Sequence, residues 1–307
     1  MARRLGRAAL RVVLVLLAFP LIGVGIQAWA EHSSHEEFPA PGKLVEVGGG
    51  QVIHLRTWGD ETNGPTIILD VSCCQPSSIW AWVARDLSTS HRVVAYDRPG
   101  MAWSLGPSGP RHAESAAGAL TAALAAAGIG PPFVVIGHSY GGLSARVFAG
   151  MHRDEVRGVV LLDTTHPDGG GGQGFALFSR LYAWKGHSGL LQLSPPPNDY
   201  EQLPTDEAAG AYAASLWTTH LDATAEELEA WDLTTAQARA VGDFGDLPLL
   251  VASVPGPPEH LVLQRDLLRL SSNSTFVELN ASHMGMLMDH DQAAATVTEI
   301  KRFLDSL

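Results

Sequence analysis

The segment from Val134 to Gly142 constrains the fold more than any other part of the chain. It reads Val-Val-Ile-Gly-His-Ser-Tyr-Gly-Gly. The apolar run from Pro132 to Ile136 predicts a short buried strand, and the residues from Leu143 to Ala149 have helical periodicity. Ser139 therefore lies at a turn from a strand into a helix, with a glycine two positions before it and another two positions after it. The turn is so sharp that a side chain at either glycine position would clash, and it leaves the serine hydroxyl exposed above the sheet.

A Gly-x-Ser-x-Gly sequence can arise by chance in a glycine-rich chain, but the strand before it and the helix after it favour a nucleophile elbow. This arrangement resembles the α/β-hydrolase superfamily, and the resemblance extends from about Pro41 to Leu304. It implies an α/β-hydrolase fold with Ser139 as the nucleophile. It also implies a helical cap, inserted into the sheet domain, that covers the serine.

The order of the predicted elements indicates the same fold. Strands alternate with helices up to Asp163 and again from Leu247, which is typical of a mostly parallel, doubly wound sheet. Between these two parts, a glycine tract at 169–172 and a run of three prolines at 195–197 interrupt the alternation, and helical stretches rich in Trp and Leu surround them. The resulting division is an α/β-hydrolase core of residues 42–165 and 247–307 and a helical cap of residues 166–246.

The first thirty residues read as a targeting or membrane segment. Four arginines within the first eleven residues precede a nearly uncharged run from Val12 to Ala30, and an acidic, polar stretch follows. Positive charge before the run and negative charge after it predict a body outside the cytoplasm. The run is just long enough to span a bilayer, yet Ala28-Trp29-Ala30 also fits a signal-peptide cleavage site. We expect residues 1–30 to be a signal peptide or a membrane anchor, residues 31–41 to be a polar linker, and the body to be either secreted or anchored at its N-terminal segment.

Charge and cysteine content exclude several classes of function. The net charge is −12 with histidine neutral, and basic residues cluster only at the N-terminus. Nucleic-acid binding needs clustered Lys and Arg, so it is not expected. Cys73 and Cys74 are the only cysteines, and because they are adjacent they could close only a strained ring. They therefore predict no disulfide framework, and they lack the spacing of a metal site. No metal and no cofactor are predicted.

A nucleophilic serine needs a histidine base, which an acid must orient. In the superfamily both follow the serine in the chain. His283 follows the predicted strand 275–279 and precedes the last helix, where the superfamily places its histidine. His290, seven residues later, is the alternative base.

The position of the acid is less regular. The superfamily most often carries it after the strand that this sequence places at 247–254, but the loop there offers only Glu259. Asp163 instead ends the wholly apolar strand before it, as in the branch of the superfamily that includes some haloalkane dehalogenases. Because the carboxyl ends of parallel strands are where ligands bind, we assign the acid to Asp163 and keep Glu259 as the alternative.

The resemblance also implies an oxyanion hole made of two backbone N–H groups. The first belongs to Tyr140, which follows the nucleophile. Register with the superfamily suggests Cys73 as the second donor, with Ser72 at a position where the superfamily usually has glycine. The Asp97-Arg98-Pro99-Gly100 turn resembles a turn of the superfamily, and we interpret it as a structural brace for the loops behind the elbow.

These residues predict a serine hydrolase with a Ser139–His283–Asp163 triad. The apolar, aromatic cap favours an uncharged carboxylic ester as the small-molecule substrate. A serine nucleophile excludes haloalkane dehalogenase and epoxide hydrolase chemistry, both of which need a carboxylate nucleophile. Two alternatives remain. One is an aminopeptidase-like hydrolase, in which Glu207 or Glu226 would bind the substrate amine. The other is a non-catalytic protein of the same fold that binds a lipid or a protein partner.

Overall fold

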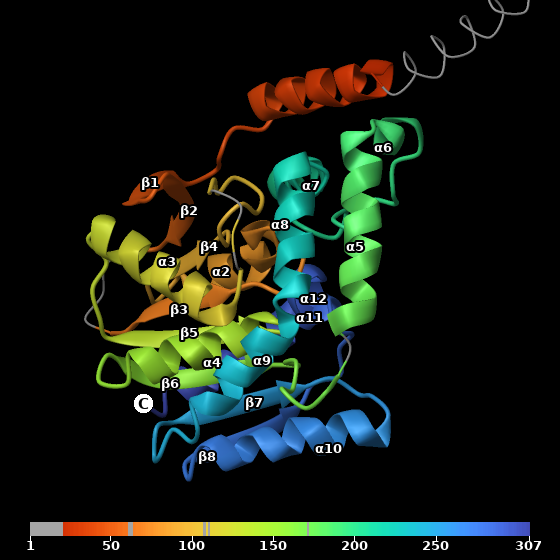
Figure 1. Ribbon diagram of the computed structural model, residues 1–307. Helices are drawn as coiled ribbons and strands as arrows, with labels where there is room; N and C mark the ends of the chain where they lie inside the picture. Colours follow the sequence, from red (N-terminus) through yellow and green to blue (C-terminus); the bar gives the residue numbers. More distant parts are fainter. Residues whose placement is uncertain (1–20, 61–63, 107–108, 110, 171) are drawn as a thin grey trace, which may run out of the picture.

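The centre of the structure, a computed structural model, is an eight-stranded sheet with the order β1-β2-β4-β3-β5-β6-β7-β8 (Figure 1). The structure describes residues 21–307 apart from 61–63, 107–108, 110 and 171. β1 and β2 form an antiparallel hairpin, and β2 pairs antiparallel with β4. Every pairing from β4 across to β8 is parallel. The mostly parallel sheet predicted from the sequence is therefore confirmed.

The strands in the middle of the sheet are buried along nearly their whole length, because helices cover both faces. Such strands appear in the sequence as short apolar runs, which made them recognisable. The strand bounds are β1 Lys43–Gly48, β2 Gln51–Trp58, β3 Thr66–Asp70, β4 Val93–Tyr96, β5 Phe133–His138, β6 Val156–Leu162, β7 Leu249–Ser253 and β8 Ser274–Glu278.

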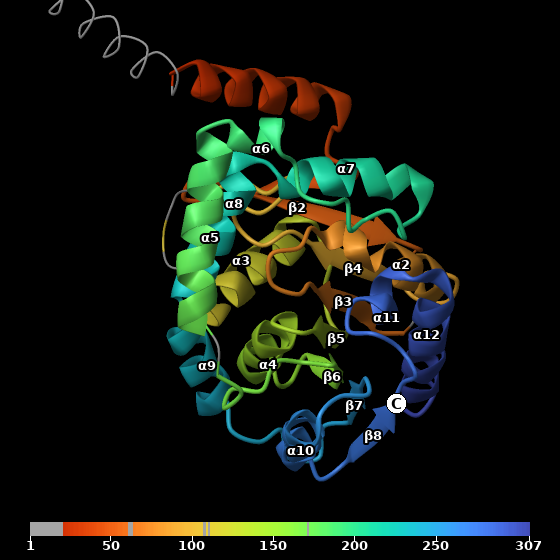
Figure 2. The same cartoon turned by 90° about the vertical axis from the view of Figure 1, so that its right-hand side faces the viewer.

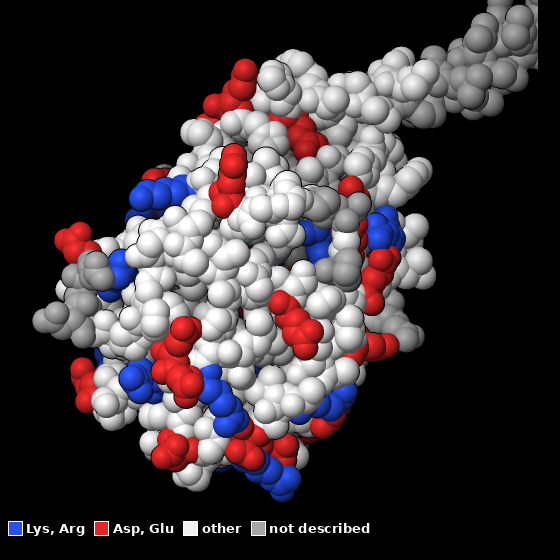
Figure 3. Space-filling view, turned by 60° about the vertical axis from the view of Figure 1, so that its left-hand side comes forward, with Lys and Arg blue, Asp and Glu red and all other residues white. Residues whose placement is uncertain are grey.

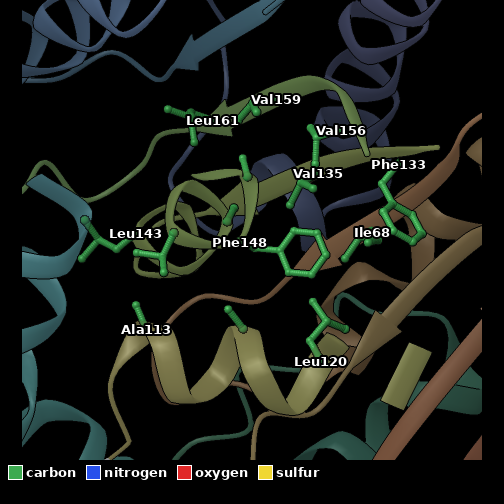
Figure 4. Close-up of a cluster of buried hydrophobic side chains, with 14 of the residues drawn as sticks. Ile68, Ala113, Leu120, Phe133, Val135, Leu143, Phe148, Val156, Val159 and Leu161 are labelled. Carbon is green, nitrogen blue, oxygen red and sulfur yellow. The ribbon is translucent and has the colours of Figure 1, made fainter. Parts of the chain in front are cut away.

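Alternate residues of each strand point to opposite faces, so each face of the sheet has its own apolar layer. In β5, Val135 packs beneath α3 and α4, whereas Val134 and Ile136 pack on the other face with α2, α11 and α12. Figure 4 shows Phe148 of α4 lying between Val135 and Leu120 of α3. The helices and 3-10 turns of the core are η1 Ser77–Trp80, α2 Ala81–Leu87, α3 Ala113–Ala126, α4 Gly141–Met151, α10 Pro258–Asp266, η2 Leu267–Leu270, α11 Gly285–Met288 and α12 His290–Leu304.

The excursion between β6 and β7 is helical, as the sequence predicts. α5 and α8 pack along each other, and α6 and α7 lie at their far end (Figure 2). α9 leaves this group and packs against α3 and α4 of the core. The bounds are α5 Gly172–His187, α6 Leu190–Leu193, α7 Thr205–Ser215, α8 Thr218–Glu229 and α9 Trp231–Ala240.

Residues 21–37 form a helix that lies against the cap, in red in Figure 1. We expected a linker from residue 31, but the helix continues through 31–37 because its polar side chains find partners at the start of α8. Trp217 Nε1 donates to Ser34 Oγ at 2.9 Å, and the Thr218 hydroxyl donates to Glu31.

The signal or anchor prediction concerns residues 1–30, and residues 1–20 lie outside the described residues. Within the part that is described, no helix has both the length and the apolar character needed to cross a bilayer. The charged surface is mixed: on the face in Figure 3, the Lys and Arg side chains are scattered and most lie near Asp or Glu.

Candidate active site

The turn between β5 and α4 holds Ser139 in a left-handed backbone conformation, with a φ of 53°. Residues other than glycine seldom adopt this conformation, so the surrounding structure must impose it. A Cβ at Gly137 would lie 2.6 Å from the Gly142 Cα, and a Cβ at Gly141 would lie 2.5 Å from the Asp70 carbonyl oxygen. Backbone contacts therefore require both glycines, for the steric reason expected from the sequence.

Asp163 and His283 meet although 120 positions separate them in the chain. Asp163 directly follows β6, His283 lies in the loop after β8, and His283 Nδ1 is 2.6 Å from Asp163 Oδ2. An ionised carboxylate can only accept, so Nδ1 carries the hydrogen. In the neutral imidazole the lone pair is then at Nε2, which is the tautomer that a general base needs.

Ser139 and His283 line the same cavity, and the His283 side chain is 44% exposed. Among the described residues, no hydrogen bond joins the Ser139 hydroxyl to the His283 imidazole. Catalytic hydrogen bonds are often long in enzymes without substrate and shorten when the substrate is bound. Ser139 and His283 therefore line the same cavity, but no hydrogen bond between their side chains fixes their relative position in the described structure.

Asp163 is surrounded by donors. Its Oδ1 accepts from Ser253 Oγ at 3.1 Å, from the Val254 N–H at 3.2 Å and from His260 Nε2 at 2.8 Å. Burial raises the pKa of Asp163, but the hydrogen bonds from His283, Val254 and His260 outweigh it and lower the pKa to about 2. Asp163 is thus a carboxylate throughout the neutral range and can stabilise a positive charge on His283.

His260 is a functional candidate that the sequence analysis missed. It lies in the first turn of α10, directly after Glu259, the alternative acid. Its imidazole makes Asp163 a carboxylate shared by two histidines. Glu259 itself is exposed and forms no hydrogen bond with His283 in the described structure. His290, the alternative base, is largely exposed and lines neither of the cavities that contain Ser139.

His138, which precedes the nucleophile, supports the loop of the proposed base. Its Nε2 lies 2.8 Å from the His283 carbonyl oxygen, so this nitrogen carries the hydrogen and donates. Burial, with repulsion from His283, lowers the pKa of His138 to about 3. His138 therefore stays neutral, and its hydrogen bond to the backbone fixes the position of the His283 loop.

The two backbone N–H groups proposed for the oxyanion hole, those of Tyr140 and Cys73, both adjoin Ser139. Cys73, Cys74 and Ser139 line one cavity, and Tyr140 is the next residue in the elbow. In the described part of the chain, neither N–H group has a hydrogen-bond acceptor, so both are available to a ligand oxygen. Cys73 and Cys74, whose redox state the sequence leaves open, form a disulfide with each other.

His220 of α8 connects the cap to this loop. Its Nδ1 accepts from the Ala102 N–H at 3.0 Å, and its Nε2 donates to the Cys74 carbonyl oxygen at 3.2 Å. Burial lowers the pKa of His220 to about 4, so the ring is neutral and can accept with one nitrogen while donating with the other. The sequence offered no signal for this role.

Arg98, in the turn interpreted as a brace, binds the loop after β3 and also reaches the cap. It donates to Asp70 Oδ1 at 2.9 Å, to the Val71 carbonyl at 2.5 Å and to the Ser72 carbonyl at 3.0 Å. Two further hydrogen bonds, of 2.6 and 2.9 Å, go to the Glu227 carboxylate of α8. Burial acts to lower the pKa of Arg98, but Glu227 and Asp70 raise it above its ordinary value. Arg98 therefore stays charged and holds the loop of Cys73.

The two cap carboxylates considered for binding a substrate amine are both occupied by arginine. Glu207 accepts two hydrogen bonds from Arg56, of 2.7 and 2.6 Å, and is buried. Glu226 accepts from Arg111 at 2.6 Å. Neither lines a cavity that contains Ser139. The arrangement thus gives no support to the aminopeptidase-like alternative.

Ser139 lies between two cavities. The larger, of about 530 Å³, is bounded by the disulfide loop and the cap and is lined mainly by apolar side chains. It includes Phe175, Phe178 and Leu228. The smaller, of about 360 Å³, has His283 and His260 in its wall. Within the described residues, no group of three or more His, Cys, Asp or Glu side chains is arranged to hold a metal ion.

Comparison with known protein families shows which family this fold and this serine turn belong to. The profile described as the alpha/beta hydrolase family matches residues 71–298, which is well over half of the chain. The chain belongs to this family. That assignment agrees with the mostly parallel sheet and with the serine at the turn after β5.

Several relatives resemble this α/β-hydrolase. The enol-lactonase from Burkholderia xenovorans LB400 has a structure with a TM-score of 0.65 and 25% identity, covering 85% of this chain and 99% of that one. A protein of Gibberella zeae described as an AB hydrolase superfamily protein is 27% identical over 243 residues, or 74% of this chain and 71% of that protein. An uncharacterised protein of Schizosaccharomyces pombe is 42% identical over 77 residues, which are 25% of this chain and 14% of that protein.

Proposed function

We propose that this α/β-hydrolase is a serine hydrolase that cleaves uncharged carboxylic esters with an apolar acyl group. The observation that carries the proposal is the 2.6 Å contact between Asp163 and His283 beside a strained, accessible Ser139. A carboxylate that selects the base tautomer of a histidine enables that histidine to take the proton of a nearby serine hydroxyl.

The reaction follows from the positions of these groups. Ser139 Oγ attacks the ester carbonyl carbon while His283 Nε2 takes its proton, and Asp163 stabilises the imidazolium that forms. The developing oxyanion accepts hydrogen bonds from the Tyr140 and Cys73 N–H groups. His283 then returns the proton to the leaving alcohol. Water attacks the acyl-enzyme by the same steps and releases the carboxylic acid.

The two cavities suggest how the ester lies across Ser139. The leaving oxygen must approach His283 Nε2 to receive a proton, so the alcohol part occupies the smaller cavity, where His283 forms the wall. The acyl part then occupies the larger, apolar cavity. Asp199, an exposed residue, is the one charged side chain among the described lining residues of that cavity, which favours an uncharged acyl group.

The test is active-site labelling combined with a substrate series. A fluorophosphonate probe should label the purified protein, and Ser139→Ala should remove the label and lower esterase activity by on the order of 10⁴-fold or more. Hydrolysis of p-nitrophenyl esters should improve with acyl chain length until the larger cavity is filled. Undiminished labelling of Ser139→Ala, or no hydrolysis of any ester by a correctly folded protein, would sink the proposal.

A further inference from the structure

The cap has a run of large apolar side chains that remain in contact with solvent. They lie on α5 and α6, each is between 58% and 71% exposed, and we call them the cap apolar surface: Phe175, Leu177, Phe178, Leu181, Trp184 and Leu193. Soluble proteins seldom expose such a continuous set, and where they do, it usually marks a binding surface. The inner side of α5 packs on α8, so this outer side is not needed for the fold of the cap.

The helix of residues 21–37 extends this surface. A Cβ at Gly23 would overlap the Ser188 carbonyl oxygen, and a Cβ at Gly189 would overlap the Gly23 carbonyl oxygen, so the helix touches the turn between α5 and α6. Figures 1 and 2 both show it passing beside α6. Leu21, Ile22, Val24, Ile26 and Trp29 on this helix are exposed as well.

The nature of the occupant follows from the residues around this contact. Residues 21–30 of the helix contain no charged side chain, and in the sequence they continue the apolar run that begins at Val12. A chain segment of this composition favours the hydrocarbon of a bilayer over water. Because its helix is fixed to the α5–α6 turn, a bilayer that receives this segment also reaches the part of the cap apolar surface next to that turn.

α5 also borders the cavity assigned to the acyl group. Phe175 and Phe178 are highly exposed and yet line that cavity together with Ser179 and Tyr182. An acyl chain leaving a bilayer at α5 would therefore remain against apolar side chains until it reached Ser139. This placement avoids exposing the CH₂ groups of the chain to water, which is unfavourable.

We propose that the cap apolar surface lies on a lipid bilayer and that the acyl chain of the substrate enters the larger cavity from that bilayer past α5. The contact with the bilayer rests on the cap apolar surface and on the uncharged helix segment beside it, and it does not depend on catalysis. The entry of an acyl chain rests on the proposed ester hydrolase function. Substrates of this site are then esters that reside in a membrane, with the ester group near the headgroup level.

Site-specific labelling of the full-length protein tests the contact. Leu181→Cys and, as a control, Val262→Cys on α10 each introduce one thiol at an exposed apolar position, while Cys73 and Cys74 are joined in a disulfide. Each thiol carries an environment-sensitive fluorophore, and phosphatidylcholine vesicles are added. The emission at position 181 should shift to shorter wavelength, and the emission at position 262 should not change.

Hydrolysis separates this proposal from the proposed function. Leu181→Glu should lower the rate on a long-chain ester embedded in the vesicles about tenfold or more, since burial of one leucine is favourable by more than a factor of ten in an equilibrium. The same variant should hydrolyse a short, soluble p-nitrophenyl ester at the wild-type rate, and Val262→Glu should leave both rates unchanged. Loss of hydrolysis of both esters by the wild-type protein, with vesicle contact intact, would contradict only the esterase function.

Three outcomes would overturn the membrane proposal. The first is a full-length protein that does not bind vesicles. The second is binding without any spectral shift at position 181. The third is a shift at position 181 that occurs without vesicles and disappears on dilution, because this result would assign the surface to contact with a second copy of the chain.

Discussion

The core and the cap of this α/β-hydrolase are stabilised by different interactions. The core buries two apolar layers, one on each face of a sheet whose middle strands are almost fully covered. The cap is joined to the core by apolar contacts, such as Trp217 against Trp103, and by two buried ion pairs, Arg98 with Glu227 and Arg56 with Glu207. It leaves the outer side of α5 exposed. Apolar burial is spread over many residues and has no direction, whereas an ion pair depends on two side chains and their geometry. The ion pairs therefore make the position of the cap over Ser139 sensitive to a few residues.

The proposed catalytic groups belong to the core, so the largest effect on the reaction should come from a core residue. Asp163→Asn keeps the shape of the side chain but permits the wrong histidine tautomer, and kcat should fall on the order of 10³- to 10⁴-fold with little change in KM. Steady-state kinetics on a p-nitrophenyl ester measures this. Glu259→Gln is the matched control and should keep its activity. If Glu259→Gln loses activity while Asp163→Asn stays active, the acid is Glu259 in the loop after β7.

The connection between cap and core can be broken at Glu227. Glu227→Ala leaves Arg98 buried with fewer partners, and we expect the free energy of unfolding to fall by about 3–5 kcal/mol. Urea unfolding monitored by circular dichroism measures the loss. A change below about 1 kcal/mol would mean that apolar contacts hold the cap and that the contrast with the core is wrong.

Acid should act on the core through Asp163. Its pKa is lowered from 3.8 to about 2 in the folded protein, so the folded state holds this proton less tightly than the unfolded state. The resulting stabilisation is complete above the unfolded value and is lost as the pH falls from 3.8 to about 2. Melting temperatures across this window should decline less steeply for Asp163→Asn than for the wild-type protein. If the melting temperatures of the two proteins fall in parallel, the pKa of Asp163 is not lowered in the folded state.

His260 offers a smaller effect at the same carboxylate. His260→Leu removes one hydrogen bond to a charged group, and kcat should fall about tenfold while KM stays unchanged. Because this bond helps to lower the pKa of Asp163, the acid loss of stability should also become smaller and end at a higher pH in the variant. His290→Leu, which removes an exposed histidine that pairs with Asp291, should change neither quantity. If the dependence of stability on acid pH is the same for His260→Leu and the wild-type protein, His260 contributes packing only and does not lower the pKa of Asp163.

The smallest effect is expected at an exposed ion pair of the cap. Glu229 accepts two hydrogen bonds from Arg180, of 2.5 and 2.6 Å, in the same two-bond arrangement as Glu227 with Arg98. Both Glu229 and Arg180 are more than 40% exposed, so Glu229→Ala should cost about 0–1 kcal/mol in the same urea experiment. A loss as large as that of Glu227→Ala would show that burial is not what distinguishes the two pairs.

Local sequence patterns were sufficient for the core and for the elbow. Buried strands such as β5 are apolar runs bounded by glycine or proline, and Ser139 lies where such a run meets a helix. Steric limits on Gly137 and Gly141 act over a few residues, so they can be read from neighbouring positions. Asp163 and His283 could be proposed from the sequence because each ends a predicted strand or follows one, at the edge of the sheet where ligands bind, and their side chains do meet there.

The remaining features depend on contacts between distant parts of the chain. His260 meets Asp163 across 97 positions and Arg98 meets Glu227 across 129, and no periodicity marks either pair. The helix of residues 21–37 continues past its apolar run because α8 supplies partners for Glu31 and Ser34. Local sterics and apolar periodicity are properties of the sequence by itself. The partners of a buried charge and the exposure of the apolar side chains on α5 are decided only when the cap and the core come together in space.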